Sequence, residues 1–200
     1  MSYNRDIHNR KSIRLRGYDY SQTGAYFVTI CMQNRSCLLG RITESVVEPS
    51  DAGIMVQKVW NEIPDHYQSV KLGAFVAMPN HIHAIIITIE PPNAHNHAHV
   101  HVGAGPRACP AGSMQTHEQG NHGGLPLRSL PDIIHRYKTM TTKRYADGVK
   151  NCGWTPFQGK LWQRNYYEHI IRNDADYKRI EEYINNNPRT WKDDKLWTSQ

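Results

Sequence analysis

The sequence predicts an α+β domain: an antiparallel sheet of the ferredoxin-like, split βαβ kind, with helices packed on one face and a C-terminal helix that bears a tyrosine. The chain has 200 residues, which suits a single domain. Short apolar runs rich in β-branched residues alternate with longer stretches of helical periodicity. Their order is strand, helix, strands, helix, strand, helix, and an antiparallel sheet covered by helices accommodates that order.

Five segments are expected to be extended. Residues 25–31 combine aromatic and β-branched residues, a composition typical of a strand. A weaker strand is expected at 37–42. Residues 70–78 lead, as strand or extended chain, through a turn to the apolar run at 84–87, which has the composition of a buried strand. Residues 160–169 are predicted to be a strand or an extended segment.

Three helices are expected between these segments. The first covers about 52–67, with Ser50 at its start as a capping residue and a proline near its end. The second runs from its cap at Ser129 to about Tyr145. The third covers about 174–187, and the proline that follows is expected to close it.

Two segments are expected to lie outside the packed core. Residues 1–17 form a basic arm, either a phosphate-binding arm or an ordinary solvated terminus. Residues 91–127 are rich in Gly, Pro and His with almost no large apolar residues, so they are predicted to be a flexible, low-complexity insertion. The insertion contains an alternating histidine run, which we interpret as incidental because nothing holds its side chains in one geometry: His95, His97, His99 and His101.

The charge balance favours a polyanionic partner. The formal net charge is +6, from 24 Lys and Arg against 18 Asp and Glu, and nucleic acid is the simplest such partner. The chain also has 11 Tyr and 5 Trp, which supply aromatic faces on which bases can stack.

Several classes of protein are disfavoured by the composition. The four cysteines form no C-x-x-C pair, which argues against a zinc knuckle or ribbon. No stretch approaches the roughly 18 apolar residues of a membrane span, and the polar N-terminus lacks the apolar region of a signal peptide. We therefore expect a cytoplasmic protein with no membrane partner.

A pair of histidines marks the start of the strand that contains residues 84–87. His81 and His83 are separated by Ile82, and residues two apart on a strand point to the same face. Two imidazoles side by side suit a divalent metal ion. They are equally compatible with polar residues at the point where a strand leaves the core.

The third predicted helix supplies a second group of polar residues. Tyr177, Ile180 and Ile184 form a compact apolar face, and Tyr183 and Asn187 lie one turn apart at its edge. A tyrosine can act as a nucleophile toward a phosphate, and a metal held by the histidines and the Asn187 carbonyl oxygen would stabilise charge on that phosphate. The ordinary alternatives are a half-buried helix tyrosine and a C-terminal capping amide.

Five blocks of sequence together resemble one known family. They are Tyr18–Tyr20 with Gly24–Ile30, Met78–His83, Ser129–Arg144, Trp162–Arg172 and Tyr183–Pro188. In this order and spacing they resemble the REP-associated tyrosine transposases, a branch of the HUH single-tyrosine transposases. The His-x-His pair alone would be a weak signal, whereas its combination with the Trp-Gln-Arg and Tyr-Ile-x-x-Asn-Pro blocks is specific.

The resemblance implies a function. It implies a ferredoxin-like domain that binds single-stranded or hairpin DNA, such as REP-like palindromes. Tyr183 would attack a backbone phosphate, form a 5′-phosphotyrosine link and leave a free 3′-hydroxyl. Mg²⁺ or Mn²⁺ would be held by His81, His83 and Asn187. In several transposases with this motif the amide is Gln, so Asn187 is a shorter ligand, and two imidazoles shift the preference toward Mn²⁺.

Basic residues in and near these blocks are candidate DNA contacts, although a basic face is commonly just solvated. They are Arg14, Arg16, Arg136, Lys138, Lys143, Arg164, His169 and Arg172. Tyr166 and Tyr167 are rival nucleophiles, and the resemblance places the nucleophile on the later helix instead.

The sequence thus predicts a metal-dependent transposase or single-strand endonuclease, with two alternatives. One is a catalytically silent module that grips hairpin DNA, and the other is a histidine-rich metal-handling protein. The DNA target, the choice between monomer and homodimer, and whether the tyrosine helix packs on its own sheet or on a partner's stay open.

Overall fold

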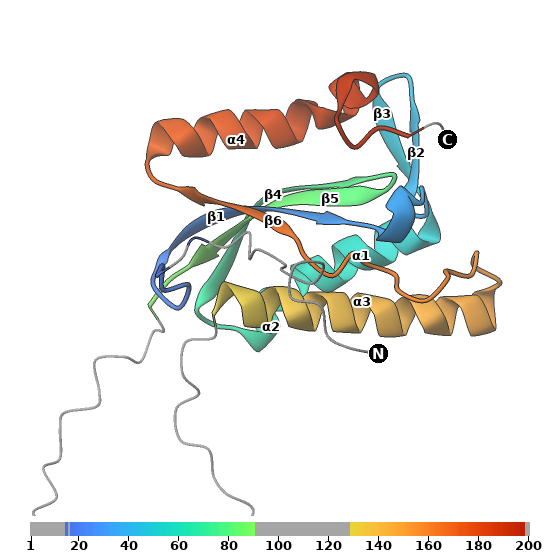
Figure 1. Cartoon of the computed structure of the whole chain (residues 1–200), viewed down its shortest axis with the longest axis horizontal. Helices are drawn as coiled ribbons and strands as arrows, with labels where there is room; N and C mark the ends of the chain where they lie inside the picture. Colours follow the sequence, from blue (N-terminus) through green and yellow to red (C-terminus); the bar gives the residue numbers. More distant parts are fainter. Residues whose placement is uncertain (1–14, 16, 91–128, 199–200) are drawn as a thin grey trace, which may run out of the picture.

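The structure is a computed structural model that describes residue 15 and residues 17–90 and 129–198 (Figure 1). Two candidate phosphate contacts, Arg14 and Arg16, lie outside the described residues. The insertion at 91–127, with its histidine run, also lies outside the described residues. The roles given to the basic arm and to the insertion therefore stay predictions. Among the described residues, none of the helices combines the length and apolar character that a bilayer crossing needs.

A four-stranded antiparallel sheet organises the domain. Its strands are β1 (Gly24–Cys31), β4 (Val70–Met78), β5 (His81–Thr88) and β6 (Tyr167–Ile171). They lie in the order β4-β5-β1-β6, and every neighbouring pair is antiparallel. Because β5 inserts between β1 and β4, the first two sheet strands are separated in space, which is the arrangement of a split βαβ fold.

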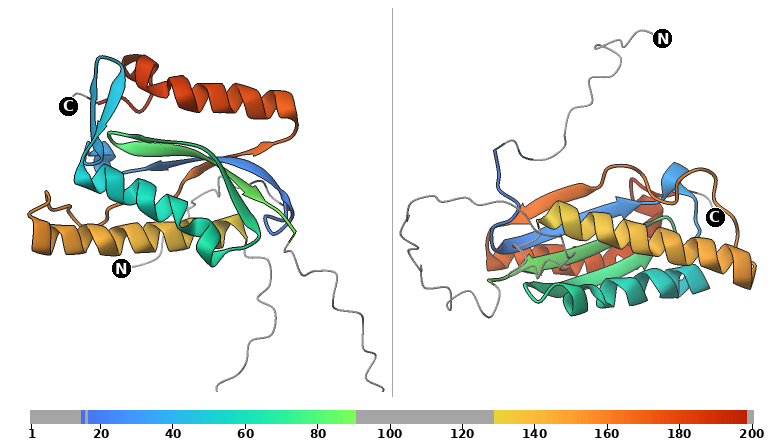
Figure 2. Two further views of the ribbon diagram at one scale, coloured as in Figure 1. Left: turned by 180° about the vertical axis from the view of Figure 1, so that it is seen from behind. Right: turned by 90° about the horizontal axis from the view of Figure 1, so that it is seen from below.

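Helices cover both faces of this sheet (Figure 1). The helices α1 (Asp51–Asn61), α2 (Ile63–His66) and α3 (Leu130–Cys152) occupy one face, and Figure 2 shows α1 and α3 side by side there. The C-terminal helix α4 (Asp174–Asn186) lies on the other face. The predicted α+β class, with helices on one face and a separate C-terminal tyrosine-bearing helix, is confirmed.

Strand alternation divides the core into two layers. On β5, Ile82 and Ile86 point into the larger core beneath α1 and α3, whereas Ile85 points toward α4. Ile180 and Ile184 of α4 are almost fully buried against that second layer. Each such burial contributes about 1.5–3 kcal/mol, so the apolar face of α4 fixes the helix over the sheet.

Several boundaries differ from those expected. The weak strand expected at 37–42 is β2 (Gly40–Thr43), which forms a hairpin with β3 (Val46–Pro49) that the sequence pattern did not indicate. A short 3-10 helix, η1 (Gln33–Arg35), precedes it. The strand expected at 160–169 is β6, which starts only at Tyr167 because the residues before it form an irregular connection.

The helix ends also differ, for identifiable reasons. The expected first helix is split into α1 and α2, and Pro64 sits in the first turn of α2, where its missing N–H costs nothing. The second helix runs past Tyr145 to Cys152, where Gly153 adopts a left-handed conformation. The third helix, α4, ends at Asn186, and the chain continues directly into the 3-10 helix η3 (Asn187–Asp193). Pro188 lies in the first turn of η3.

The predicted caps of the first two helices are both present. The Ser50 side chain accepts a hydrogen bond from the backbone N–H of Gly53. Ser129 and Asp132 form a capping box at the start of α3.

Lys138 of α3 ties the irregular connection before β6 to the helix. Its ammonium donates hydrogen bonds to the backbone carbonyls of Gln163, Arg164 and Asn165, at 3.0, 3.4 and 3.1 Å. Burial lowers the pKa of Lys138 to about 8, so the group is still mostly charged at neutral pH. Lys138 was expected to be a phosphate contact, but its donors are directed at the protein's own backbone.

We predict that Lys138→Met lowers the free energy of unfolding by about 1–2 kcal/mol, because the partly buried Gln163 carbonyl and two exposed carbonyls lose a charged donor. Denaturant unfolding followed by circular dichroism measures the change. Lys143→Met, at an exposed position on the same helix, is the matched control and should change stability little. Equal effects of the two substitutions would contradict an anchoring role for Lys138.

Candidate functional site

Two buried histidines face α4 at the end of the sheet. His81 is the first residue of β5, directly after the two-residue turn formed by Pro79 and Asn80. His81 pairs with Cys31 of β1, and His83 pairs with Thr29. Both imidazoles point to the face covered by α4 and are at most 3% exposed. The side-by-side arrangement expected from their spacing is therefore present, in a buried setting.

The hydrogen bonds of Asn80 fix the tautomer of His81. The Asn80 amide nitrogen donates to the Leu196 backbone carbonyl at 2.8 Å, so the amide oxygen is the atom that faces His81 Nδ1, also at 2.8 Å. An amide oxygen can only accept, and His81 Nδ1 must therefore carry the hydrogen. His81 Nε2 consequently presents a lone pair toward His83.

His83 completes an unusual contact between two ring nitrogens. Its Nε2 lies 3.0 Å from His81 Nε2, and its Nδ1 lies 2.8 Å from the Thr29 hydroxyl. If the hydroxyl donates to Nδ1, then His83 Nε2–H donates to His81. If His83 Nδ1–H instead donates to the hydroxyl, two lone pairs face each other, and a cation between them would stabilise that state.

A carboxylate joins the two histidines from the end of η3. Asp194 Oδ2 lies 4.0 Å from His83 Nε2, and the ligand atoms of His81, His83 and Asp194 all lie within 4.8 Å of one another. Sequence reasoning missed Asp194. It follows the recognisable helix pattern by several residues and sits in a charged stretch that looks like ordinary surface. Only the turn of η3, with Trp191 packed beside His81, brings it back to the sheet.

Asn187 lies against this group and keeps one atom unsatisfied. Its side chain is 1% exposed, and its Nδ2 donates to Asp194 Oδ2 at 3.3 Å. Its Oδ1 is buried without a hydrogen-bond partner. A buried amide oxygen without a donor normally costs about 1–3 kcal/mol, and a cation bound beside it would remove that cost.

Tyr183 is the exposed member of the cluster. Its hydroxyl lies 3.3 Å from His83 Nε2, although the side chain as a whole is 45% exposed. Burial of the hydroxyl, followed by the nearby Asp194 charge, raises the pKa of Tyr183 above its ordinary value. The surrounding protein therefore keeps this tyrosine protonated, and an added positive charge nearby would act in the opposite direction.

Burial keeps both imidazoles neutral. It lowers the pKa of His81 to about 3, with the neighbouring His83 acting in the same direction. It also lowers the pKa of His83, against the opposing effect of Asp194. The pKa of the Asp194 carboxyl lies well below its usual range, because hydrogen bonds and the histidines outweigh the effect of its burial. Neutral imidazoles and an ionised carboxylate are the forms that bind metals.

The donor set fits a divalent metal ion. Two ligand atoms at right angles around an ion at about 2.1 Å stand about 3.0 Å apart, which is the spacing of the two Nε2 atoms. His81 and His83 offer nitrogens, while Asp194 and the unpartnered oxygen of Asn187 offer oxygens. Mixed nitrogen and oxygen ligands are compatible with Mn²⁺ and, less favourably, with Mg²⁺.

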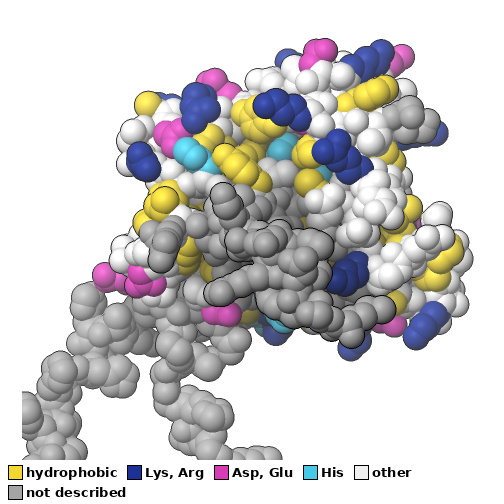
Figure 3. Space-filling model, in the orientation of Figure 1, with side chains coloured by type: hydrophobic (Ala, Val, Ile, Leu, Met, Phe, Trp, Pro, Cys, Tyr) yellow, Lys and Arg dark blue, Asp and Glu magenta, His cyan; other side chains and the backbone are white. Residues whose placement is uncertain are grey.

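A cavity of about 1090 Å³ opens beside this cluster, between α4 and β6. His83, Tyr183, Asn187 and Asp194 line one part of it, and His169 lines another. Figure 3 shows Lys and Arg side chains around a patch of hydrophobic and histidine side chains on this side of the molecule, below α4. The cavity is open to solvent, because Tyr167 and Tyr183, which line it, are 53% and 45% exposed.

The other predicted DNA contacts lie in two different parts of the fold. Arg164 and Arg172 are exposed at the two ends of the segment that contains β6. Arg136 and Lys143 lie on α3, on the opposite face of the sheet from the histidines. The structure thus brings together His81, His83, Tyr183 and Asn187 in one cluster, with His169 on the same cavity, and separates them from the α3 residues.

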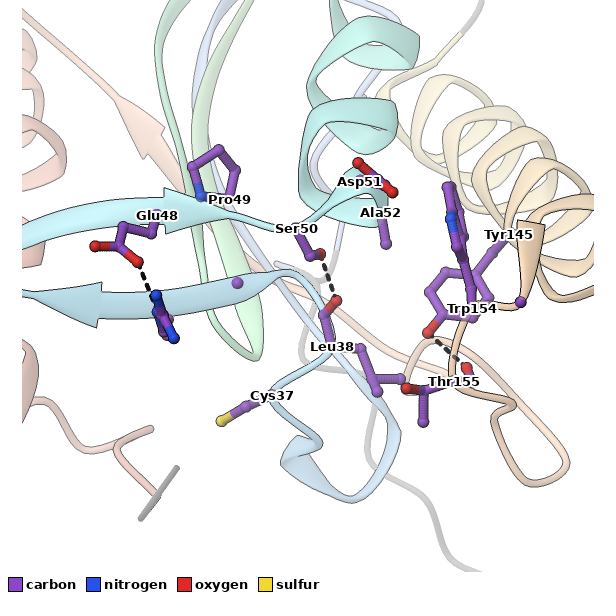
Figure 4. A pocket seen from close by; sticks show the side chains of 13 residues that line it. Cys37, Leu38, Glu48, Pro49, Ser50, Asp51, Ala52, Tyr145, Trp154 and Thr155 are labelled. Carbon is purple, nitrogen blue, oxygen red and sulfur yellow. Dashed lines mark hydrogen bonds and ion pairs between the residues drawn. The ribbon is translucent and has the colours of Figure 1, made fainter.

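A second cavity, of about 530 Å³, lies between the β2–β3 hairpin, the start of α1 and the end of α3 (Figure 4). Two of its polar side chains are bonded within the protein: Ser50 donates to the Leu38 carbonyl, and the Tyr145 hydroxyl donates to the Thr155 carbonyl. It contains no grouping comparable to the histidine cluster among the residues drawn.

Comparison with known proteins gives a family and a fold. No family model matches the chain. An uncharacterized protein of Haemophilus influenzae is 35% identical over 198 residues, which cover 98% of this chain and 97% of that protein. The chain belongs to the same family as this Haemophilus protein. Since that relative is uncharacterized, family membership alone does not assign an activity.

The fold comparison is more specific. The structure of a REP-associated tyrosine transposase bound to a REP hairpin matches with a TM-score of 0.52. The match covers 88% of this chain and 73% of that one, at 20% sequence identity. At this identity the comparison establishes a shared fold. The resemblance to REP-associated tyrosine transposases is therefore supported at the level of the fold.

We predict that the metal-free protein loses stability as the pH falls from 7 to 5. The unfolded chain takes up a proton on His81 near the ordinary pKa of 6.5, while the folded chain does not until about pH 3. Stability is therefore lost toward low pH, by at most about 1.4 kcal/mol per pH unit for each such group.

Denaturant unfolding in EDTA at several pH values measures this slope. His81→Gln should make it shallower, whereas His135→Gln, an exposed position on α3, should leave it unchanged. An identical slope in His81→Gln and the native chain would show that His81 is not held neutral by burial.

Proposed function

We propose that this protein is a metal-dependent transposase-type nuclease that cuts and rejoins single-stranded or hairpin DNA through a covalent tyrosine link. The observation that carries the proposal is the 3.3 Å contact between the Tyr183 hydroxyl and His83 Nε2, within the cluster that contains His81, Asp194 and Asn187. A phosphate positioned there would touch both the nucleophile and the metal-binding group.

The proposed reaction exchanges one phosphate ester bond for another. The Tyr183 oxygen attacks a backbone phosphorus, an O–P bond forms, and the bond from phosphorus to the 3′-oxygen breaks. The tyrosine loses its proton and the leaving 3′-oxygen gains one, so the step is balanced and yields a 5′-phosphotyrosine and a 3′-hydroxyl. Attack by a 3′-hydroxyl on the same phosphorus reverses the step and rejoins or transfers the strand.

The cluster prepares this attack in two ways. When bound, Mg²⁺ or Mn²⁺ supplies positive charge that lowers the pKa of the tyrosine and stabilises charge on the phosphate oxygens. His81, His83, Asp194 and Asn187 would hold the ion. Asn80 and Thr29 orient the two imidazoles, because each bonds the ring nitrogen that faces away from the cluster.

The proposed substrate rests on charge and on the fold comparison. The chain carries a net charge of +6, and the transposase of the same fold was solved bound to a REP hairpin. We therefore propose hairpin DNA with single-stranded flanks, of the REP-like kind, as the partner of this chain. The protein could work as a monomer with its own α4, because Tyr183 reaches the histidines within one chain.

Tyr183→Phe is expected to abolish formation of a covalent protein–DNA adduct. The test incubates the protein with Mn²⁺ and a library of hairpin oligonucleotides with randomised flanks, then separates denatured adducts by electrophoresis. Tyr177→Phe, on the same helix but packed near Gly73, is the matched control and should retain the adduct. Removal of the metal with EDTA should prevent adduct formation by the native chain.

Two results would overturn parts of this assignment. An adduct that persists in Tyr183→Phe and disappears in Tyr167→Phe would move the nucleophile to β6. Binding of hairpins with no adduct from any of them would favour the silent DNA-binding module.

Asp194→Asn should weaken Mn²⁺ binding. Removal of a residue that only supports a metal ligand lowers metal affinity about 10–100-fold, and Asp194→Asn should lower the Mn²⁺ affinity by at least this factor. Titration calorimetry of the purified protein with Mn²⁺ provides the measurement. Asp193→Asn, at the preceding exposed position, is the control and should bind Mn²⁺ normally. Equal affinities for all three proteins would exclude Asp194 from the metal site.

A further inference from the structure

Three aromatic rings form a continuous contact along the cavity beside the histidine cluster. Phe27 of β1 lies on the floor, with its ring centre 6.0 Å from that of Tyr183 and 6.2 Å from that of Tyr167. Both tyrosine rings stand nearly edge-on to Phe27, at interplanar angles of 83° and 68°. All three residues line the same cavity.

The exposure of Tyr167 is not explained by packing. Phe27 is 8% exposed and serves the core, whereas Tyr167 is 53% exposed at the edge of the sheet. An exposed aromatic ring that lines a cavity, next to a buried aromatic floor, offers a flat apolar face to a ligand. The proposed cleavage reaction assigns no task to this ring.

The sheet register places Tyr167 at a fixed distance from the metal-binding group. Thr29 pairs with His83 on one side and with Tyr167 on the other, so these three residues form one row across β5, β1 and β6. Strands lie about 4.8 Å apart, so Tyr167 and His83 are about 10 Å apart across the row. A phosphate at the cluster and a ring at Tyr167 are therefore separated on the scale of one nucleotide.

Polar groups continue the cavity beyond the aromatic rings. His169 pairs with Phe27 in the next row of the sheet, and its Nε2 is 3.0 Å from Asp176 Oδ2. Arg179 also bonds Asp176, and both His169 and Arg179 line the cavity. His169 and Arg179 therefore extend the lining of the cavity with polar groups beyond the aromatic rings, and Asp176 offsets part of their charge.

We propose that Tyr167, supported by Phe27, is a stacking subsite for a single unpaired base adjacent to the phosphate that Tyr183 attacks. The inference rests on the proposed function, in which the strand is already single-stranded at the cut, and adds the residue that holds the neighbouring base, because only an unpaired base exposes its face to Tyr167. Stacking tolerates any base, since every base has a π-face. The subsite therefore selects for strand state rather than for sequence.

A binding measurement tests the subsite without requiring cleavage. Short single-stranded oligonucleotides carry the fluorescent base 2-aminopurine at one position each, and fluorescence is followed as protein is added. We expect quenching at one position with the native chain and with Tyr167→Phe, which keeps the ring. Tyr167→Leu should lose that quenching and bind about 5- to 150-fold more weakly, the range for loss of one stacked base. Equal quenching and affinity in Tyr167→Leu would overturn the proposal.

A second measurement links the subsite to cleavage. An abasic nucleotide is placed in turn at each position next to the cut, and the rate of adduct formation is measured. For the native chain, an abasic nucleotide at one position should lower the rate of adduct formation. Tyr167→Leu should lower the rate on intact DNA by the same factor. The abasic nucleotide should then lower the rate of Tyr167→Leu no further. Losses that simply multiply would overturn the subsite while leaving the adduct, and hence the proposed function, intact. Absence of any adduct together with position-specific quenching would overturn the cleavage and retain the base subsite.

Discussion

The site depends on the contact between the Nε2 atoms of His81 and His83, 3.0 Å apart and buried. Asn80 fixes one ring so that its lone pair faces the other, and Thr29 permits either tautomer of the second ring. This arrangement can hold a single shared proton or a cation. Burial disfavours the fully protonated pair, so the contact is better suited to a metal than to a second proton.

Three segments complete the cluster: the turn between β4 and β5, the helix α4 and the helix η3. The turn between β4 and β5 supplies Asn80, and the backbone of that turn is held by Met32 and Leu39. The apolar face of α4 sets the height of the helix over the sheet, which brings Tyr183 to His83 while its ring stays open to solvent. The helix η3 then returns Asp194 to the same point. A buried group of candidate metal ligands and an accessible tyrosine hydroxyl are thus brought together from three separate segments.

The sequence was most informative where periodicity is strong. The strand pair His81 and His83 and the helical pair Tyr183 and Asn187 each follow from a local spacing of two or four residues, and the packing of α4 on the sheet brings the two pairs together. Asp194 could not be predicted in this way, because its position depends on a 3-10 turn with no periodic signature. The contact of Phe27 with Tyr167 and Tyr183 could not be predicted for a similar reason. The start of β6 at Tyr167 is set by the register with β1 rather than by composition.

The central claim is that the paired imidazoles form a metal site, and X-ray diffraction at the manganese absorption edge from crystals grown with Mn²⁺ tests it most directly. The account predicts an anomalous peak bounded by His81 Nε2, His83 Nε2 and the Asp194 carboxylate, with the Asn187 oxygen turned toward it. An absence of anomalous density at this position, with the two imidazoles still hydrogen-bonded to each other at saturating Mn²⁺, would contradict it.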